Sequence, residues 1–558
     1  MSQNNSLSRA AVQGWEEADS TLSNALKPFL ESCSHLEAFY VPEGGNLDSL
    51  ISRIDSTLDL LTQSRSLLSR MRNRTRSPLC RLPEDILIKI FLEVIFVPTE
   101  EERAGYPEME SAVRIVYQRM HSLNRVCTAW RNVLNCKAAW HVVPIMHSEQ
   151  KLGRKLVTDL SLQRAGSGFH LAVIKLYDWT SNELKILAEH AHRFSSANIR
   201  AKSPADVEVI IKAFLESRRP AMLSKLDICH IPAQQSISSG RYRFHSPQPY
   251  VFSEHSNLQG PFTKMLEPLS VLCVSGVLLD WRIITFSGRL TELYLHGVHI
   301  GDHSHFIAFL QAASSAPELE HLSIISVATT SNTHPLQPAS YSKFTFPKLQ
   351  SLRLGCLYSN VLGLVLGSIS PGSHRLSLHL NENSLVYYVG KEAFKQSCRV
   401  FEQVALDTLE LDSRDCPRLH EHLASLLKVT PHLKVLKLSH WRFNETVWDV
   451  LTRPAFNDTP FPNLEELHLS AAVCSPSNLA AIKRMVQSHS IRKMVIGVCV
   501  QETETPTQVR SSHLDQEHLA ETLGADVIEW LVSAVPEVHL GITRVDPPEF
   551  RPHWWGLW

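Results

Sequence analysis

The stretches Leu433-Lys-Val-Leu-Lys-Leu438 and Leu464-Glu-Glu-Leu-His-Leu469 share one pattern, Leu-x-x-Leu-x-Leu, and this pattern decides the fold. With conservative replacements it recurs in copies that begin at Leu171, Leu223, Leu269, Leu290, Leu319, Leu349, Leu406 and Ile491. Degenerate copies lie at Phe194 to Ile199 and at 376–380. Successive copies start mostly 21 to 31 residues apart. Such a period predicts a repeat architecture, in which each unit contacts only its neighbours and no single large core is needed.

Between the copies, the spacing of apolar residues changes from two to three and four. Helical faces follow from Leu423, Leu426 and Leu427 and from the similar sets at 447–451 and 479–486. Ser203-Pro204 has the residue types that begin a helix. Each repeat is therefore predicted to run strand, turn, helix. The pattern is typical of an α/β leucine-rich-repeat solenoid over 147–558, with a curved parallel sheet and helices on its convex side.

The residues that line the concave face follow from the alternation of side chains across a strand. The residue between the last two apolar positions of each copy points outward. These residues are Lys175, Asp227, Cys273, Tyr294, Ser323, Arg353, Glu410, Lys437, His468 and Val495. The row mixes both signs of charge, whereas a nucleic-acid groove would be consistently basic with interleaved aromatics. We expect a target protein on this face and no nucleic acid; a merely solvated sheet face would give the same pattern.

Three long insertions interrupt the repeats, near 231–266, 325–346 and 498–516. Long loops in a solenoid are either functional or disordered, and the composition favours disorder slightly. The aromatic tail is expected to cap the last repeat, because the open ends of a solenoid need cover. Its aromatic residues are Phe550, Trp554, Trp555 and Trp558.

A separate helical region is predicted at 78–146. Leu82-Pro-Glu-Asp-Ile-Leu-Ile-Lys-Ile-Phe91 begins a helix, since proline and acidic residues suit the first helical turn. A polar loop at 96–112 follows, and the helical pattern resumes towards Val126-Cys-Thr-Ala-Trp-Arg131. A further tryptophan, Trp140, comes soon after.

These two motifs, in this order, resemble the F-box, most closely in its fungal form. The connection at 96–112 is longer than in the compact family pattern. The resemblance implies a small all-α domain that docks onto the Skp-type adaptor of a cullin–RING ubiquitin ligase. The docking residues it implies are Leu82, Pro83, Ile86, Leu87, Ile90, Phe91, Val126, Cys127 and Trp130.

A physical reason to expect a partner stands beside the resemblance. A helical domain of about 65 residues is marginally stable alone, and its helices carry apolar residues on more than one face. Leftover apolar patches commonly mark a protein–protein interface. The alternative is that these side chains pack on the preceding helix and on the first repeat.

The region that precedes it has a leader and a patterned helix. Residues 1–45 read as a flexible leader with one weak helix around Trp15 to Phe29. Residues 46–77 carry a heptad stripe of Leu47, Ile51, Ile54, Leu58, Leu61 and Leu68, broken at Arg65. Self-association through 47–71 as a coiled coil and packing within the domain both fit this stripe. The arginine run from Arg65 to Arg81 favours a solvated helix end over a nuclear-import or RNA-binding patch.

Composition excludes several classes of protein. The formal net charge of −1 gives no whole-chain attraction for nucleic acid or for an anionic membrane. The N-terminus lacks a signal-peptide pattern, and no window has the apolar length to span a bilayer. Eleven scattered cysteines without a Cys-x-x-Cys pair favour reduced thiols in the cytosol or nucleus.

No sequence pattern indicates an enzyme. There is no nucleophile elbow, phosphate-binding glycine loop or His-Glu-x-x-His motif. The densest metal candidate is His296, His299, His303 and His305, in a turn where polar residues are expected anyway. We therefore expect no catalytic residue, no cofactor and no metal.

The favoured interpretation is a substrate-receptor subunit of an SCF-type ubiquitin ligase, with the repeats holding the target. The alternative is a leucine-rich-repeat scaffold outside ubiquitination, in which the helical region serves only folding. An enzyme with a site in an inserted loop and an RNA-export factor are weaker rivals.

Overall fold

The computed structural model describes most of the chain. The described residues are 2–38, 47–99, 109–146, 151–175, 181–217, 222–230, 248–253, 255–330, 343–370, 372, 374–381, 384, 398–399, 401–402, 404–413, 419–454, 460–474, 479–498 and 524–541. The chain forms two compact units, Met1–Pro83 and Glu84–Trp558. The predicted boundaries at 77/78 and 146/147 therefore differ from the observed one.

The first unit is helical. It contains α1 (Ser2–Ala38), α2 (Leu47–Arg76) and the 3-10 turn η1 (Pro78–Arg81). Helix α1 is much longer than the weak helix predicted for Trp15 to Phe29. Helix α2 agrees with the heptad pattern. The described side chains of both helices are mostly exposed.

The second unit begins with helices. These are α3 (Glu84–Phe96), α5 (Met109–Asn124), α6 (Thr128–Val133) and η2 (Lys137–Trp140). Strand β1 (Val142–Met146) follows at once and pairs in parallel with β2 (Phe169–Lys175). The helical region is therefore continuous with the sheet. Residues 142–146, predicted as part of the helical domain, form the first strand of that sheet.

One parallel sheet of 15 strands forms the rest of the unit, consistent with an α/β solenoid. Its strands follow chain order, except that β12 pairs only with β13. The remaining strands are β3 (Phe194–Ala201), β4 (Lys225–His230), β5 (Val271–Ser275), β6 (Glu292–His299), β7 (His321–Ala328), β8 (Ser351–Gly355), β9 (Arg375–Leu380), β10 (Leu406–Asp412), β11 (Val435–Ser439), β12 (Arg442–Phe443), β13 (Glu466–Cys474), β14 (Lys493–Val498) and β15 (Glu537–Gly541).

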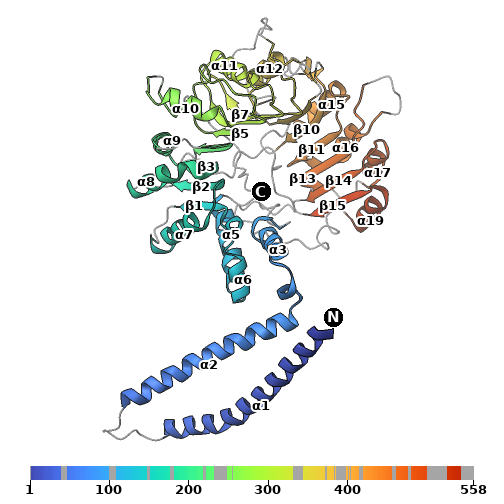
Figure 1. The fold of residues 1–558 in the computed structure, drawn as a ribbon. Coiled ribbons are helices and arrows are strands. Elements are labelled where there is room, and N and C mark those ends of the chain that lie inside the picture. The colour runs from blue at the N-terminus through green and yellow to red at the C-terminus, as the bar shows by residue number, and fades with distance from the viewer. Residues whose placement is uncertain are drawn as a thin grey trace. The chain divides into compact units, whose positions relative to one another are not determined.

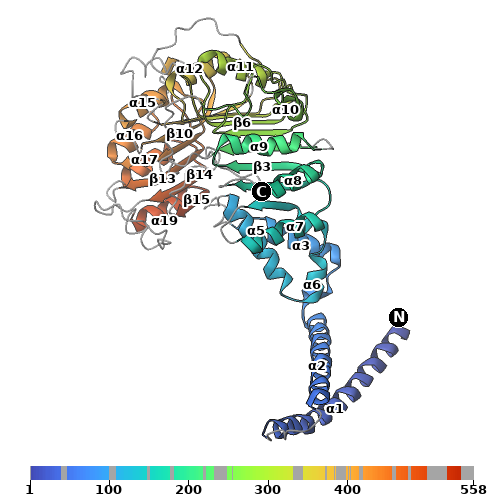
Figure 2. The ribbon, with the colours of Figure 1, turned by 90° about the vertical axis from the view of Figure 1, so that its left-hand side faces the viewer.

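Helices connect the strands and cover one side of the sheet. They are α7 (Lys151–Arg164), α8 (Ser181–His190), α9 (Pro204–Leu215), α10 (Gln259–Leu266), α11 (His303–Ser314), α12 (Ser359–Ser368), α15 (Leu419–Val429), α16 (Glu445–Leu451), α17 (Leu479–Gln487) and α19 (Ala525–Ala534), with a 3-10 turn η3 (Ala191–Arg193). Figures 1 and 2 show that the strands form the inner layer of the solenoid and that helices such as α9, α12 and α16 form its outer layer. The predicted start of α9 is confirmed, since Ser203 Oγ accepts a hydrogen bond from Asp206 N at 3.2 Å.

The repeat leucines form the core between strands and helices. Leu272, Leu293, Leu322 and Leu352 are directly paired along neighbouring strands, and all are buried. Because each interior leucine lies beside the corresponding leucine of the next repeat, the core is one continuous ladder. All ten clear copies of the pattern lie at strands, and the two degenerate copies are β3 and β9.

Several repeats have a residue with a positive φ four positions after an aligned core leucine of the strand. Gly276, Gly297, Ser326, Cys356, His440 and Ala471 all have φ between 49° and 70° and occupy the same position of their repeats. At Gly276 a Cβ would press against the backbone carbonyl of His230. The turn out of the strand is therefore built into the repeat, and at Gly276 it requires glycine.

The insertions differ in part from the predicted disorder. The first contains helix α10, and strand β7 continues to Ala328 at the start of the second. Residues 231–247, 331–342 and 499–516 lie outside the described residues, as does the aromatic tail with Phe550, Trp554, Trp555 and Trp558. The sequence pattern missed β1, β12, β15 and α19 because these short elements lack the full leucine motif.

Candidate interaction surfaces

The two halves of the helical region meet at an aromatic contact. Phe91 of α3 and Trp130 of α6 have ring centroids 4.8 Å apart. Leu87, Phe91 and Ile95 are one helical turn apart and form the buried face of α3. The two sequence motifs are therefore brought together by packing, and the loop between them does not separate them.

Cys127 and Trp130 have structural roles within this region. Cys127 is the N-cap of α6, and its Sγ accepts a hydrogen bond from Trp130 N at 3.5 Å. Trp130 is half-buried against Phe91. Of the predicted docking residues, Leu87, Phe91, Cys127 and Trp130 thus contribute to the region's own stability.

Another face of α3 remains apolar and uncovered. Ile86 and Val94 expose 37% and 46% of their area, and half-buried Ile90 lies between them at the same helical spacing. We call Ile86, Ile90 and Val94 the α3 stripe. Val126, just before α6, exposes 55%. Pro83 is exposed and Leu82 half-buried. Exposed aliphatic side chains repeated along one helix form the kind of patch that marks an interface.

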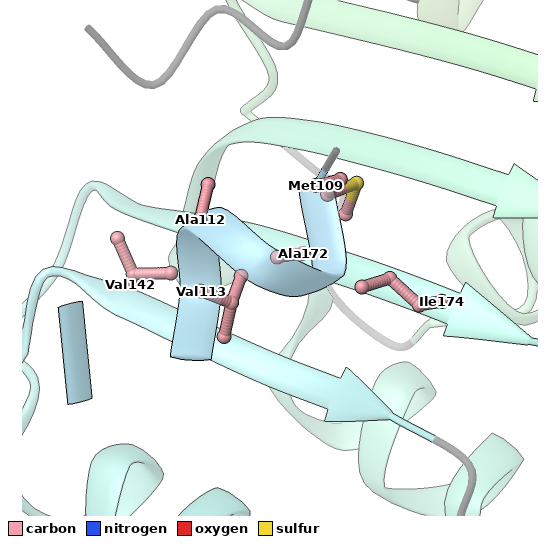
Figure 3. Close-up of a cluster of buried hydrophobic side chains, with 6 residues drawn as sticks. All are labelled: Met109, Ala112, Val113, Val142, Ala172 and Ile174. Carbon is pink, nitrogen blue, oxygen red and sulfur yellow. The ribbon is translucent and has the colours of Figure 1, made fainter. Parts of the chain in front are cut away.

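Helix α5 covers the inner face of the first two strands. Figure 3 shows Met109, Ala112 and Val113 of α5 against Val142 of β1 and against β2, where Ala172 and Ile174 complete the buried cluster. The predicted alternative, that apolar residues of the helical region pack on the first repeat, holds for α5. It does not account for the α3 stripe within the described residues.

A buried hydrogen-bond network strengthens this junction. Tyr117 of α5 donates to the Val142 carbonyl oxygen at 2.7 Å, and its hydroxyl lies 2.6 Å from Ser161 Oγ on α7. Burial raises the pKa of Tyr117 well above its ordinary value, and the bond to Ser161 opposes this only in part. Tyr117 therefore stays protonated and acts as a structural tie.

Five of the predicted concave residues form one row. Strand pairing places Asp227, Cys273, Tyr294, Ser323 and Arg353 side by side on consecutive strands. They continue to Ser377 and Thr408. The alternation rule thus predicted this part of the surface correctly.

Two corrections apply to the predicted row. Glu410, Lys437, His468 and Val495 are paired with one another, but Glu410 is aligned with His379, two residues beyond Ser377. A register shift between β9 and β10 places them in a second row of the same face. This offset depends on strand pairing, which a motif count does not contain.

The first predicted copy has a different register in the sheet. Ala172, not Lys175, is aligned with Asn198 and through it with Asp227. Leu171 and Val173 of the same strand are buried core residues. The motif does not give the register of this copy, because β2 is largely apolar on both faces, one of which is covered by α5.

Polar side chains along the first row are partly desolvated. Burial raises the pKa of Asp227 to about 7, opposed by hydrogen bonds that include Asn198 Nδ2 at 3.0 Å. Tyr294 donates to Glu292 Oε2 at 2.6 Å, and burial and this carboxylate both raise its pKa. The row therefore offers a carboxyl that changes charge near neutral pH and, two strands away, a phenol.

Charged residues of the second row have close partners. His468 Nε2 lies 3.2 Å from Oε2 of Glu466, which is aligned with the first row, and burial lowers the pKa of His468. Glu410 is buried, 4.0 Å from His379 Nε2. The sequence prediction missed His379, Glu466, Asn198, His296 and Lys493, which also lie on this face. Extending the alternation by two residues along each strand finds Glu466, His296 and Lys493, and applying it to the two degenerate copies finds Asn198 and His379.

The histidine cluster is dispersed. His296 Nε2 contacts Ser323 Oγ at 3.3 Å, His303 contacts Asn360, and His305 contacts Asp302. Within the described part of the chain, no three His, Cys, Asp or Glu side chains are grouped to hold a metal ion. Among the described helices, none has the combined length and apolar content to cross a membrane.

Comparison with known proteins adds no identification. No protein-family model matches the chain. No curated protein matches it at a significant level.

Proposed function

We propose that the chain is a substrate-receptor subunit of an SCF-type cullin–RING ubiquitin ligase, acting in the cytosol or nucleus. The α3 stripe docks onto the Skp-type adaptor, and the concave face of the sheet binds a target protein. The observation that carries this proposal is that, within the described residues, Ile86 and Val94 are exposed and Ile90 is half-buried, while Leu87 and Phe91 of the same helix are buried.

The two faces of α3 differ in burial, which supports different roles for them: one in packing and one in binding. Leu87, Phe91 and Ile95 are buried within the helical region, whereas Ile86 and Val94 on the other face are exposed. Covering apolar surface is worth about 25 cal/mol per Å², which favours a partner over water at this stripe. The stripe also lies within the residues that resemble the F-box.

The concave face supports the target-binding half of the proposal. Asp227, Tyr294 and Arg353 present acidic, phenolic and basic groups in one row on a rigid sheet. Such mixed chemistry suits a protein surface. The chain then acts by proximity: holding target and ligase together raises their effective concentration.

The experiment is a titration of the purified full chain with a Skp-type adaptor by isothermal calorimetry. We expect binding by the unaltered chain and its loss in the Ile86→Glu, Val94→Glu double variant. The matched control is Lys89→Glu, which puts the same charge on an exposed polar position of α3. Unaltered affinity in the double variant, or no binding by the unaltered chain, would refute adaptor docking.

The second candidate is a repeat scaffold outside ubiquitination, and the packing of α5 favours it. Because α5 covers β1 and β2, the helical region can serve as the N-terminal cap that a solenoid needs. This candidate predicts that the unaltered chain ignores the adaptor and that Ile86→Glu changes no partner captured by proximity labelling.

A further inference from the structure

A cysteine, a histidine and a glutamate from three neighbouring repeats meet at the second row of the concave face. Cys356 follows β8, His379 lies in β9 and Glu410 lies in β10. Cys356 Sγ is 3.7 Å from His379 Nδ1, and His379 Nε2 is 4.0 Å from Glu410 Oε1. The imidazole therefore has a thiol at one nitrogen and a carboxylate at the other, an arrangement that the proposed function does not use.

The backbone of the repeats fixes this arrangement. Gly355 is aligned with His379, and His379 with Glu410, so the three lie side by side on consecutive strands. Gly355 has no side chain to occupy the space beside His379. Cys356 has a φ of 51°, which several repeats share at this position, and its N donates a hydrogen bond to the His379 carbonyl oxygen at 3.0 Å. The turn after β8 thereby holds the Cys356 thiol at the imidazole.

The carboxylate determines what the imidazole can do. In a neutral histidine, the nitrogen that faces a carboxylate carries the proton, and the other nitrogen is an acceptor. Glu410 therefore favours the proton on Nε2 of His379, which leaves Nδ1 to accept the proton of the Cys356 thiol. A nucleophile beside a base, with the base oriented by a third group, is the arrangement of an activated thiol.

Burial distinguishes the thiol from the two groups beside it. His379 exposes 7% and Glu410 1% of their area, whereas Cys356 is half-buried. Solvent therefore reaches the cysteine more readily than the imidazole. Cys398 differs, because it is buried and burial raises the pKa of its thiol to about 11. The Cys398 thiol stays protonated near neutral pH, and the thiolate is the nucleophilic form.

We propose that Cys356 is a peroxide-reactive thiol, with His379 as its base and Glu410 as the group that orients this base. The thiolate sulfur attacks one oxygen of hydrogen peroxide, so that an S–O bond forms and the O–O bond breaks. The His379 imidazolium returns its proton to the leaving hydroxide, which becomes water. Sulfur is oxidised to a sulfenic acid and the peroxide is reduced, with no further reactant. A small electrophile suits a thiol that is half-buried.

The first test compares two thiols of the unaltered full chain. The chain is treated with limiting hydrogen peroxide near neutral pH, sulfenic acids are trapped with dimedone, and each cysteine peptide is followed by mass spectrometry. We expect Cys356 to be labelled at least about tenfold faster than Cys33, an exposed cysteine of α1, because the rate follows the thiolate fraction. Equal or slower labelling of Cys356 would overturn the proposal.

The second test removes the base. His379→Gln should slow the labelling of Cys356 at least about tenfold, while Cys33 in the same sample keeps its rate. Glu410→Gln should slow it by a smaller factor. The matched control is His468→Gln, the same change in the same row beside a different carboxylate, and should leave the Cys356 rate unaltered. An unaltered rate in His379→Gln, or an equal loss in the control, contradicts the proposal.

A pH profile separates activation from a change in access. Altered access changes the alkylation rate of Cys356 by iodoacetamide by one factor at every pH. Loss of the base moves the rise of this rate to higher pH, towards the value of about 8.5 of an ordinary thiol. The charged residues nearest to His379 and Glu410 by strand register, Arg353, Lys437 and Asp412, are kept in His379→Gln.

An unshifted profile in His379→Gln overturns the proposal. Should this variant fail to fold, as judged by circular dichroism, the comparison of Cys356 with Cys33 in the unaltered chain decides. None of these results bears on adaptor binding.

Discussion

The repeat sheet and helix α2 are both built on regularly spaced leucines, yet their burial is opposite. Leu436 and Leu467 of the sheet are buried, whereas Leu58 and Leu61 of α2 are exposed. In the solenoid, the next repeat brings the covering surface a short distance along the chain. Helix α2 has no such neighbour among the described residues. Periodicity thus specifies the element, but burial depends on what the rest of the chain, or another chain, supplies.

The largest expected effect tests the difference in burial between the repeat sheet and α2. Leu436→Ala, at a position 0% exposed, should lower the free energy of unfolding by about 3 kcal/mol through lost burial and a residual cavity. Leu60→Ala, at a position 62% exposed and outside the heptad stripe, should change it by less than about 0.5 kcal/mol. Urea denaturation followed by circular dichroism measures both. Similar losses in the two variants would contradict the assignment of burial.

A smaller effect is expected at Gly276, the positive-φ residue that follows β5. Gly276→Ala should cost about 2 kcal/mol, because φ is +70° and the added Cβ meets the His230 carbonyl. Gly260→Ala in α10 is the control: its Cβ meets nothing within 4 Å, and alanine favours a helix by up to about 1 kcal/mol. Thermal unfolding of the two variants should shift in opposite directions.

A pH-dependent effect sharpens the comparison for a polar side chain. The pKa of Asp227 is about 7 in the folded chain, above the value near 4 of an unfolded aspartate. The folded state therefore binds this proton more tightly, and its stability falls as pH rises from about 4 to 7, by about 1 kcal/mol per pH unit.

Asp227→Asn should remove this slope and leave the variant relatively more stable at pH 7. Asp449→Asn, on the exposed surface of α16, serves as the control and should keep the slope. Urea midpoints at several pH values between 4 and 7 provide the measurement. An unaltered slope in the Asp227 variant would show that its carboxyl is not desolvated.

Much of the candidate surface could be predicted from the sequence. The motif gave the strand positions and the row from Asp227 to Arg353, because alternation across a strand is a local property. The motif did not predict the register of β2 or the shift of two residues that separates Glu410 from the first row. Both depend on which residues pair across strands and on a helix, α5, that covers β2 from elsewhere in the sequence.

The sequence by itself determined the kind of most elements: the repeating strands, the convex helices, the heptad helix and the helices that carry the two motifs. Only the tertiary structure decided which motif residues are packed, as Phe91 is, and which remain exposed, as Ile86 and Val94 do. The physical reason is the distance along the chain over which each property is set. Apolar periodicity is set by neighbours within a few residues, whereas burial is set by contacts between segments that are distant in the chain.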